Sequence, residues 1–201
     1  MLTDATFKPA WWLPSPHLQT LWPFMFRRRY SLDLRLERLE LDDGDFVDLC
    51  WSLKTDRPIV LILHGLEGSV NSHYAGSLMH SLEHAGFRPV LMHFRGCSGE
   101  PNRLPRSYHS GDTGDLLQVI EHIGRTTEGP VHAAIGFSLG GNVLLKWLGQ
   151  SGDANPLQYA VAVSVPFRLA DAANRLAGGL SHMYEIHLMS RLKRSYIDKF
   201  K

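Results

Sequence analysis

The chain has 201 residues, of which 44% are hydrophobic and 20% are charged. These proportions are typical of a soluble globular protein with one substantial core. The net charge is only +1, so there is no reason to expect binding to nucleic acid or bulk attraction to anionic membranes. The two cysteines, Cys50 and Cys97, do not indicate a disulfide framework, which favours a reduced compartment such as the cytoplasm.

The first 30 residues are rich in aromatic residues and proline, and we expect them to pack over the rest of the domain. The prolines at positions 9, 14, 16 and 23 predict that this segment contains no helix. It lacks the pattern of a secretory signal and the roughly 20 apolar residues of a membrane span. An alternative is a hydrophobic rim that receives acyl chains or touches a bilayer peripherally, with the arginines at 27–29 beside lipid phosphates.

Residues 31–166 are predicted to form an α/β core. An alternating pattern on both sides of Asp43-Gly44 predicts an antiparallel hairpin from residues 34–41 and 46–51. Four apolar runs predict buried strands, at residues 59–63, 88–94, 131–135 and 159–165. Helical spacing predicts helices near residues 72–84, 116–123 and 142–148. Strands that alternate with helices indicate a doubly wound, mostly parallel sheet that is covered on both faces.

The most informative motif is Gly136-Phe137-Ser138-Leu139-Gly140, which lies between a predicted strand and a predicted helix. This order is typical of a nucleophile elbow, in which a sharp turn presents the serine hydroxyl above the sheet. The glycines two positions before and after the serine let the turn close. We therefore predict that Ser138 is the nucleophile and that the Leu139 N–H stabilises an oxyanion.

A second motif, His64-Gly65-Leu66-Glu67-Gly68, follows the apolar run at residues 59–63. Hydrolases that carry a nucleophile elbow place their other oxyanion donor in a loop of this kind, and here that donor is predicted to be the Leu66 N–H. His64 is expected to support the loop through hydrogen bonds and not to transfer protons.

Together with Trp12-Leu13, the stretch from His17 to Thr20, and Phe94-Arg95-Gly96-Cys97-Ser98-Gly99, these motifs resemble the α/β-hydrolase superfamily. Within it, the chain is similar to the YheT-like branch, the AB hydrolase-4 family of predicted esterases. The resemblance covers essentially the whole chain. It implies a serine esterase that acts on small acyl esters or lipids, without a cofactor, through a Ser-Asp-His triad.

The resemblance also implies an acid and a histidine after two further strands, and residues 167–201 show no strand pattern. We interpret these residues as the start of a helical cap, and the chain as an N-terminal portion of a longer hydrolase that is inactive by itself. Asp171 with His182 or His187 is the alternative source of a triad within the chain. A second alternative is a binding protein that kept the fold and lost the chemistry.

One pattern points to a metal and is rejected. His80-Ser81-Leu82-Glu83-His84 matches the H-x-x-E-H pattern of inverted zinc peptidases. Both histidines are expected to lie off the apolar face of their helix. The sequence offers no clear third ligand for a metal ion, so no metal site is predicted.

Overall fold

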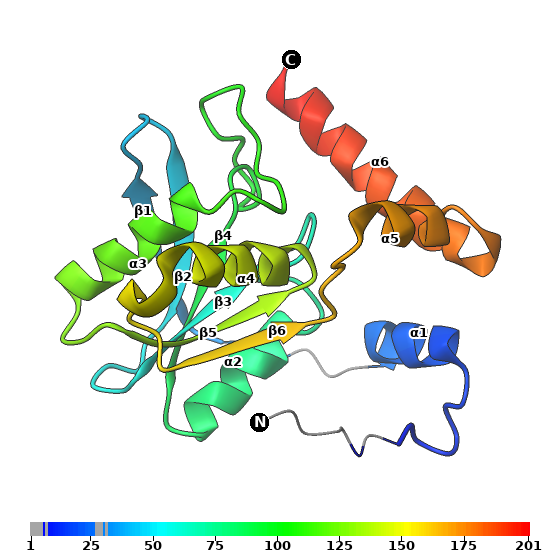
Figure 1. Ribbon diagram of the computed structural model, residues 1–201, viewed down its shortest axis with the longest axis horizontal. Coiled ribbons are helices and arrows are strands. Elements are labelled where there is room, and N and C mark those ends of the chain that lie inside the picture. The colour runs from blue at the N-terminus through cyan, green and yellow to red at the C-terminus, as the bar shows by residue number, and fades with distance from the viewer. Residues whose placement is uncertain (1–5, 7, 27–29, 31) are drawn as a thin grey trace.

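The computed structural model describes residues 6, 8–26, 30 and 32–201 (Figure 1). The arginines at 27–29 lie outside the described residues. Six strands are present: β1 (Leu34–Glu40), β2 (Phe46–Ser52), β3 (Ile59–Leu63), β4 (Arg88–His93), β5 (Val131–Phe137) and β6 (Tyr159–Val163). Six α-helices accompany them: α1 (Pro16–Phe26), α2 (Ala75–His84), α3 (Gly114–Thr126), α4 (Leu139–Ser151), α5 (Leu169–Leu176) and α6 (His182–Lys199). Two short 3₁₀ turns, Gly152–Ala154 and Gly179–Ser181, complete the elements.

The strands form one mixed sheet in the order β1-β2-β4-β3-β5-β6. Strand β2 runs antiparallel to both of its neighbours, β1 and β4, whereas β4, β3, β5 and β6 are mutually parallel. The predicted hairpin and the predicted parallel sheet are therefore confirmed. The carboxyl ends of parallel strands lie at the same end of the sheet, so the loops that follow β3, β4 and β5 come together there.

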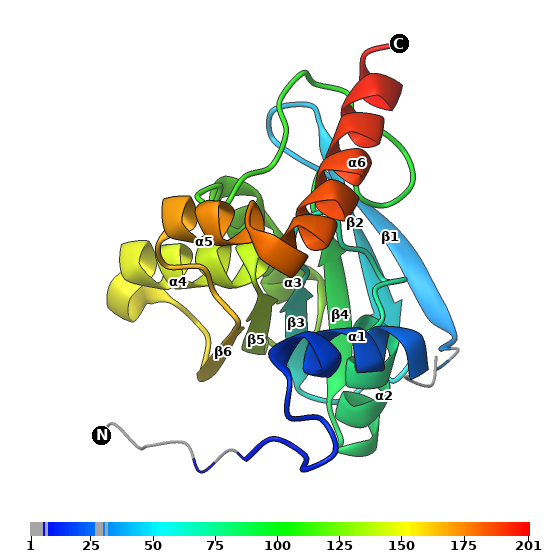
Figure 2. The same cartoon turned by 90° about the vertical axis from the view of Figure 1, so that its right-hand side faces the viewer.

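Helix α2 covers one face of the sheet, and helices α3 and α4 cover the other (Figures 1 and 2). Strand β3 shows how the core is divided, because its side chains alternate between the faces. Ile62 packs with Ala75 and Met79 of α2, while Leu61 and Leu63 belong to the larger core on the side of α3 and α4. This explains why β3 is a continuous apolar run and not an alternating one.

A buried arginine joins three separate segments of the chain. The Arg95 guanidinium lies 2.9 Å from the Asp45 carboxylate, 2.8 Å from Asp43 and 2.6 Å from Asp115. Both Arg95 and Asp45 are fully buried. The cluster ties the β1–β2 turn to the end of β4 and to the first turn of α3, and it compensates a charge that would be costly to bury alone.

Strand β6 differs from the prediction of a buried strand over residues 159–165. It ends at Val163, and two of its apolar side chains are largely exposed, Tyr159 at 64% and Val161 at 49%. In the described part of the chain β6 pairs only with β5, so it forms an edge of the sheet. An apolar run predicts a strand but does not reveal what covers it.

The N-terminal segment differs from expectation in two ways. Helix α1 begins at Pro16 and continues through Pro23, although we predicted no helix; a proline at the first helical position loses no hydrogen bond. The described aromatic side chains at positions 11, 12, 22 and 26 are exposed and do not pack over the sheet. Trp22 contacts Trp12 and Phe26, with ring centroids 5.0 and 4.3 Å apart, and all three rings remain exposed.

Residues 167–201 are helical, as their pattern predicted. Helices α5 and α6 follow β6 and lie beyond the carboxyl ends of the parallel strands, and α6 passes over the sheet (Figure 2). Within the described residues, no helix combines the length and the apolar character that crossing a bilayer requires.

Candidate active site

Ser138 occupies the sharp turn between β5 and α4. Its backbone angles are φ 50° and ψ −113°, a conformation that a non-glycine residue adopts only at a cost of about 1–3 kcal/mol. Two hydrogen bonds hold the turn: the Ser138 N–H donates to the Val163 carbonyl at 2.8 Å, and the Asn142 N–H donates to the Ser138 carbonyl at 3.1 Å. Ser138 therefore lies in a strained strand-to-helix turn, which is the backbone geometry that the predicted elbow requires.

The two glycines of the motif lie where a side chain has no space. A Cβ atom on Gly136 would come within 2.5 Å of the Gly140 carbonyl oxygen, and a Cβ atom on Gly140 within 2.5 Å of the His64 carbonyl oxygen. Backbone atoms cannot move aside cheaply, so both positions require glycine. The second contact also shows that α4 begins directly against the end of β3.

The loop after β3 lies beside the serine. A Cβ atom on Gly65 would lie 3.4 Å from the Cβ atom of Ser138. Among the N–H groups of this loop, Gly65 donates to the Tyr74 hydroxyl at 3.2 Å, Glu67 to the Tyr108 hydroxyl at 2.8 Å, and Gly68 to the Gly65 carbonyl at 3.0 Å. In the described residues, the Leu66 N–H has no acceptor and remains available to a ligand.

The other predicted donor is available for a different reason. Leu139 is the first residue of α4, and the first N–H groups of a helix have no partner within it. No acceptor in the described chain takes the Leu139 N–H. The positive end of the helix dipole adds to its preference for negative charge.

His64 is a structural residue. Its Nε2 atom accepts the Phe94 N–H at 3.1 Å, and its Nδ1 atom lies 2.7 Å from the Gly65 carbonyl oxygen, to which it donates. The side chain is fully buried, and this burial lowers its pKa to about 3, so the ring is neutral at ordinary pH. With both ring nitrogens engaged, His64 joins the loop to the end of β4.

The Ser138 hydroxyl makes no hydrogen bond to any histidine in the part of the chain that the structure describes. Asp171 pairs with Arg168 at 2.7 Å, and His182 lies 2.8 Å from Glu185. These side chains and His187 are exposed on α5 and α6. The structure does not bring Asp171, His182 or His187 to the serine.

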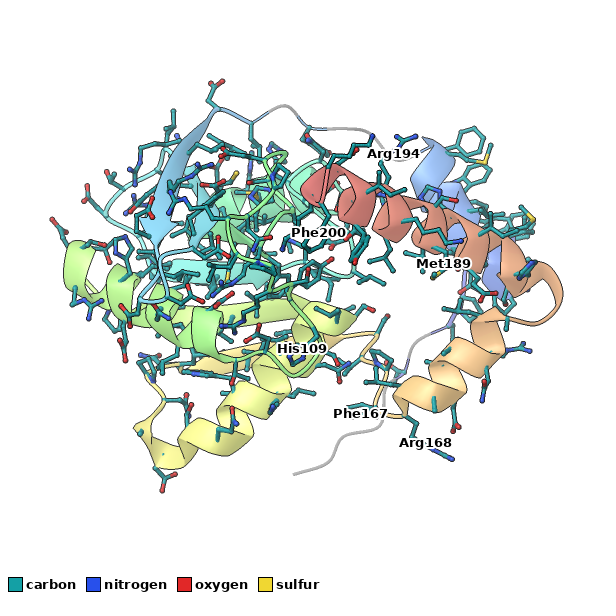
Figure 3. The ribbon with its side chains drawn as sticks, turned by 90° about the horizontal axis from the view of Figure 1, so that it is seen from above. His109, Phe167, Arg168, Met189, Arg194 and Phe200 are labelled. Carbon is teal, nitrogen blue, oxygen red and sulfur yellow. The ribbon has the colours of Figure 1, made fainter. Side chains whose placement is uncertain are left out.

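A cavity of about 660 Å³ lies next to the loop after β3. Its walls come from that loop, from the loop after β4 and from one side of α6, and include Leu66, Glu67, Tyr108, Leu192 and Tyr196. Figure 3 labels Met189 and Phe200 within and just after α6, and His109 and Phe167 on two other segments; none of these four residues lines the cavity. The cavity is mixed in character, with leucine and tyrosine side chains beside Lys193 and Lys199.

The two histidines of the rejected zinc pattern occupy different surroundings. His80 is half-buried and stacks on Tyr30 with ring centroids 4.3 Å apart. His84 is exposed, and its Nδ1 atom lies 2.9 Å from the His80 carbonyl oxygen. No group of three potential ligands is arranged around a metal position in the residues that the structure describes.

Comparison with known proteins agrees with this geometry. Residues 58–185 match the family described as alpha/beta hydrolase fold. The chain is 43% identical to YheT of Escherichia coli (strain K12) over 98% of its own length and 59% of that protein. It is 28% identical to the phospholipase ABHD3 of Mus musculus over 98% of its own length and 50% of that protein. The chain thus spans between half and three fifths of these relatives.

The fold also matches solved structures. The esterase Pf2001 of Pyrococcus furiosus superimposes with a TM-score of 0.61 at 20% identity, over 82% of this chain and 64% of that one. An identity this low supports the fold alone. Together with the family match, which covers more than half of the residues, it shows that the chain belongs to the alpha/beta hydrolase fold family, in its YheT-like branch.

Proposed function

We propose that the protein is a carboxylic-ester hydrolase in which Ser138 is the nucleophile and the N–H groups of Leu66 and Leu139 bind the oxyanion. One observation carries the proposal. A strained serine directly precedes the Leu139 N–H and lies beside the loop that carries the Leu66 N–H, and neither N–H has an acceptor among the described residues. Donors that are fixed before the reaction stabilise a developing oxyanion without reorganisation, and each contributes about 3–4 kcal/mol.

The reaction is acyl transfer to water. The Ser138 Oγ atom attacks the ester carbonyl, and its proton passes to a histidine. The tetrahedral intermediate then expels the alcohol, which takes that proton, and leaves an acyl-serine. Water, deprotonated by the same histidine, releases the acid and restores the hydroxyl. We propose that this histidine and its partner aspartate come from outside residues 1–201, and that no cofactor is used.

The substrate is proposed to be a small acyl ester or a lipid. ABHD3, whose name identifies it as a phospholipase, supports a lipid substrate for this chain. The exposed aromatic residues of α1 and the exposed apolar residues of α6 support peripheral contact with a lipid surface, and they include Trp22, Phe26, Met183 and Ile186. We further propose that the enzyme is cytoplasmic and does not bind nucleic acid. The net charge of +1 supports the absence of a nucleic-acid partner.

An inactive binding protein is the second candidate, because no histidine in the described chain contacts the Ser138 hydroxyl. Trapping of the acyl-enzyme distinguishes the two. After rapid mixing of the complete protein with p-nitrophenyl acetate, the enzyme is expected to show a burst of p-nitrophenol and an acetyl adduct on the peptide that contains Ser138. A binding protein would show neither.

A further inference from the structure

Glu67, the residue after the proposed oxyanion donor, has an unusual backbone. Its φ is 53°, in the left-handed region that favours glycine, and the residue is only 9% exposed. Glycine would adopt this conformation without strain, so the side chain must contribute something that glycine cannot. The contacts of the carboxylate show what it contributes.

Glu67 and Tyr108 form a closed pair of hydrogen bonds. The Tyr108 hydroxyl accepts the Glu67 N–H at 2.8 Å and donates to the Glu67 Oε1 atom at 3.0 Å. The tyrosine ring stacks on Phe94 with centroids 5.1 Å apart and an interplanar angle of 8°. Burial raises the pKa of Tyr108, which keeps the hydroxyl protonated and able to donate.

The second oxygen of the same carboxylate reaches the last helix. The Ser195 hydroxyl of α6 donates to the Glu67 Oε2 atom at 2.6 Å, across 128 positions of sequence. Both carboxylate oxygens are therefore occupied, one by the loop after β4 and the other by α6. Lys199 adds a second connection between these two segments, since its ammonium donates to the Asn102 side-chain oxygen at 2.7 Å.

These bonds restrain the peptide groups on either side of the Leu66 N–H. The preceding N–H, of Gly65, is held by the Tyr74 hydroxyl, and the following N–H, of Glu67, is held by Tyr108. Two fixed neighbours leave the Leu66 peptide little freedom to rotate. We propose that Glu67 and Tyr108 are positioning residues for the oxyanion donor, and that Ser195 makes this positioning depend on the seating of α6.

The inference rests on the proposed function and adds a coupling between the helical layer and the oxyanion loop. A shift of α6 removes the Ser195 bond, loosens Glu67 and lowers the preorganisation of the Leu66 N–H. A preorganised donor stabilises the transition state more than the bound ester, so its loss lowers kcat and leaves KM nearly unchanged.

The test compares four variants of the complete protein. Tyr108→Phe keeps the ring and removes both hydrogen bonds, and we expect kcat to fall about 10- to 100-fold with KM within about 3-fold. Ser195→Ala removes only the connection to α6 and should cost less. Glu67→Gln keeps one acceptor oxygen and replaces the other with an amide group that can donate to a hydroxyl, so it should retain more activity than Glu67→Gly, which relieves the backbone strain but has no side-chain acceptor.

Two further readouts separate positioning from general destabilisation. Affinity for a trifluoromethyl ketone, which forms an oxyanion on the serine, should fall by the same factor as kcat, whereas affinity for a non-hydrolysable ether analogue of the ester should not. Tyr159→Phe and Ser190→Ala remove hydroxyls that lie away from the site and serve as matched controls. Melting temperatures of all variants are compared.

The outcomes are distinguishable. If a fluorophosphonate fails to label Ser138 in the unmodified protein, the proposed function fails and this inference fails with it. If Ser138 is labelled but Tyr108→Phe and Glu67→Gly react as fast as the unmodified protein, only the positioning role is overturned. A loss of kcat that matches a loss of melting temperature, with no selective loss of ketone affinity, also overturns it.

Discussion

The backbone N–H of Ser138 donates to the carbonyl oxygen of Val163 at 2.8 Å, where β5 and β6 end side by side. The strained serine therefore depends on the edge strand as well as on its own turn. Since β6 pairs only with β5 in the described part of the chain, the strand that supports the serine also forms an edge of the sheet.

The first prediction concerns the nucleophile. Ser138→Ala removes the attacking oxygen, so it should abolish fluorophosphonate labelling of the complete protein and lower ester turnover by about 10³-fold or more. Ser190→Ala, on the exposed side of α6, is the control and should behave as the unmodified protein. Unchanged turnover in Ser138→Ala would refute the assignment.

The second prediction concerns the oxyanion loop. Leu66 acts through its N–H, so Leu66→Pro removes the donor and should lower kcat by about 10²- to 10³-fold. Leu66→Ala keeps the N–H and should lose much less. Steady-state kinetics of the two variants measure kcat, and circular dichroism checks that both are folded. Equal losses of kcat in the two variants would contradict a role of this loop in binding the oxyanion.

The third prediction compares two glycines of the same helix. A Cβ atom at Gly140 would meet the carbonyl oxygens of His64 and Leu63, whereas one at Gly149 would meet nothing within 4 Å. Gly140→Ala should therefore destabilise the protein by about 1–3 kcal/mol or more. Gly149→Ala should stabilise it by about 0.5–1 kcal/mol, because alanine favours a helix. Urea unfolding measures both, and equal effects would contradict the close approach of α4 to β3.

The fourth prediction concerns acid stability. Burial by itself raises the pKa of Asp45, but hydrogen bonds from Asn102, from the N–H groups of Arg103 and Phe46, and from Arg95 outweigh it and lower the pKa to about 2. A lowered pKa stabilises the fold above the unfolded-state value near 4, and this contribution is lost as the pH falls through 2.

Asp45→Asn should consequently reduce the free energy of unfolding by about 2 kcal/mol or more near pH 6. The difference from the unmodified protein should shrink between pH 4 and pH 2. Asp42→Asn, in the same turn but exposed, serves as the control. A difference that stays constant with pH would exclude ionised Asp45 as its source.

The fifth prediction concerns residues 1–201 expressed alone. Without a histidine in contact, the Ser138 hydroxyl keeps a high pKa and is a weak nucleophile. This chain should hydrolyse p-nitrophenyl acetate no faster than its own Ser138→Ala variant, and its exposed β6 edge should promote aggregation that light scattering detects. A monomer with Ser138-dependent turnover would instead make Asp171 with His182 or His187 the leading triad candidates.

The sequence correctly predicted those features that are determined by residues close together in the chain. The run at 59–63 matches β3 without error, and the hairpin was located by Asp43-Gly44 between two alternating segments. The elbow motif could be proposed because its glycines and serine lie within five residues, and the steric demand at Gly136 and Gly140 is local. These features depend on few contacts from elsewhere.

The parts that the sequence did not reveal depend on distant partners. Tyr74 and Tyr108 lie 9 and 41 positions from the N–H groups that they hold, and nothing in their neighbourhood distinguishes them from core tyrosines. Glu67 is in the recognised loop, but its backbone strain and its bond to Ser195 appear only in three dimensions. The exposure of β6 and of α1 likewise depends on which elements cover them.

The alternation of side chains between the two faces of β3 affects which mutations this strand tolerates. Leu61 and Leu63 face one core and Ile62 faces the other, and His64 continues directly from the strand. Deletion of a single residue from this strand would turn the side chains of the following strand residues to the opposite face of the sheet. The loop that carries Leu66 would then leave the strand on the wrong side of the sheet, so substitutions in β3 should be far better tolerated than changes in its length.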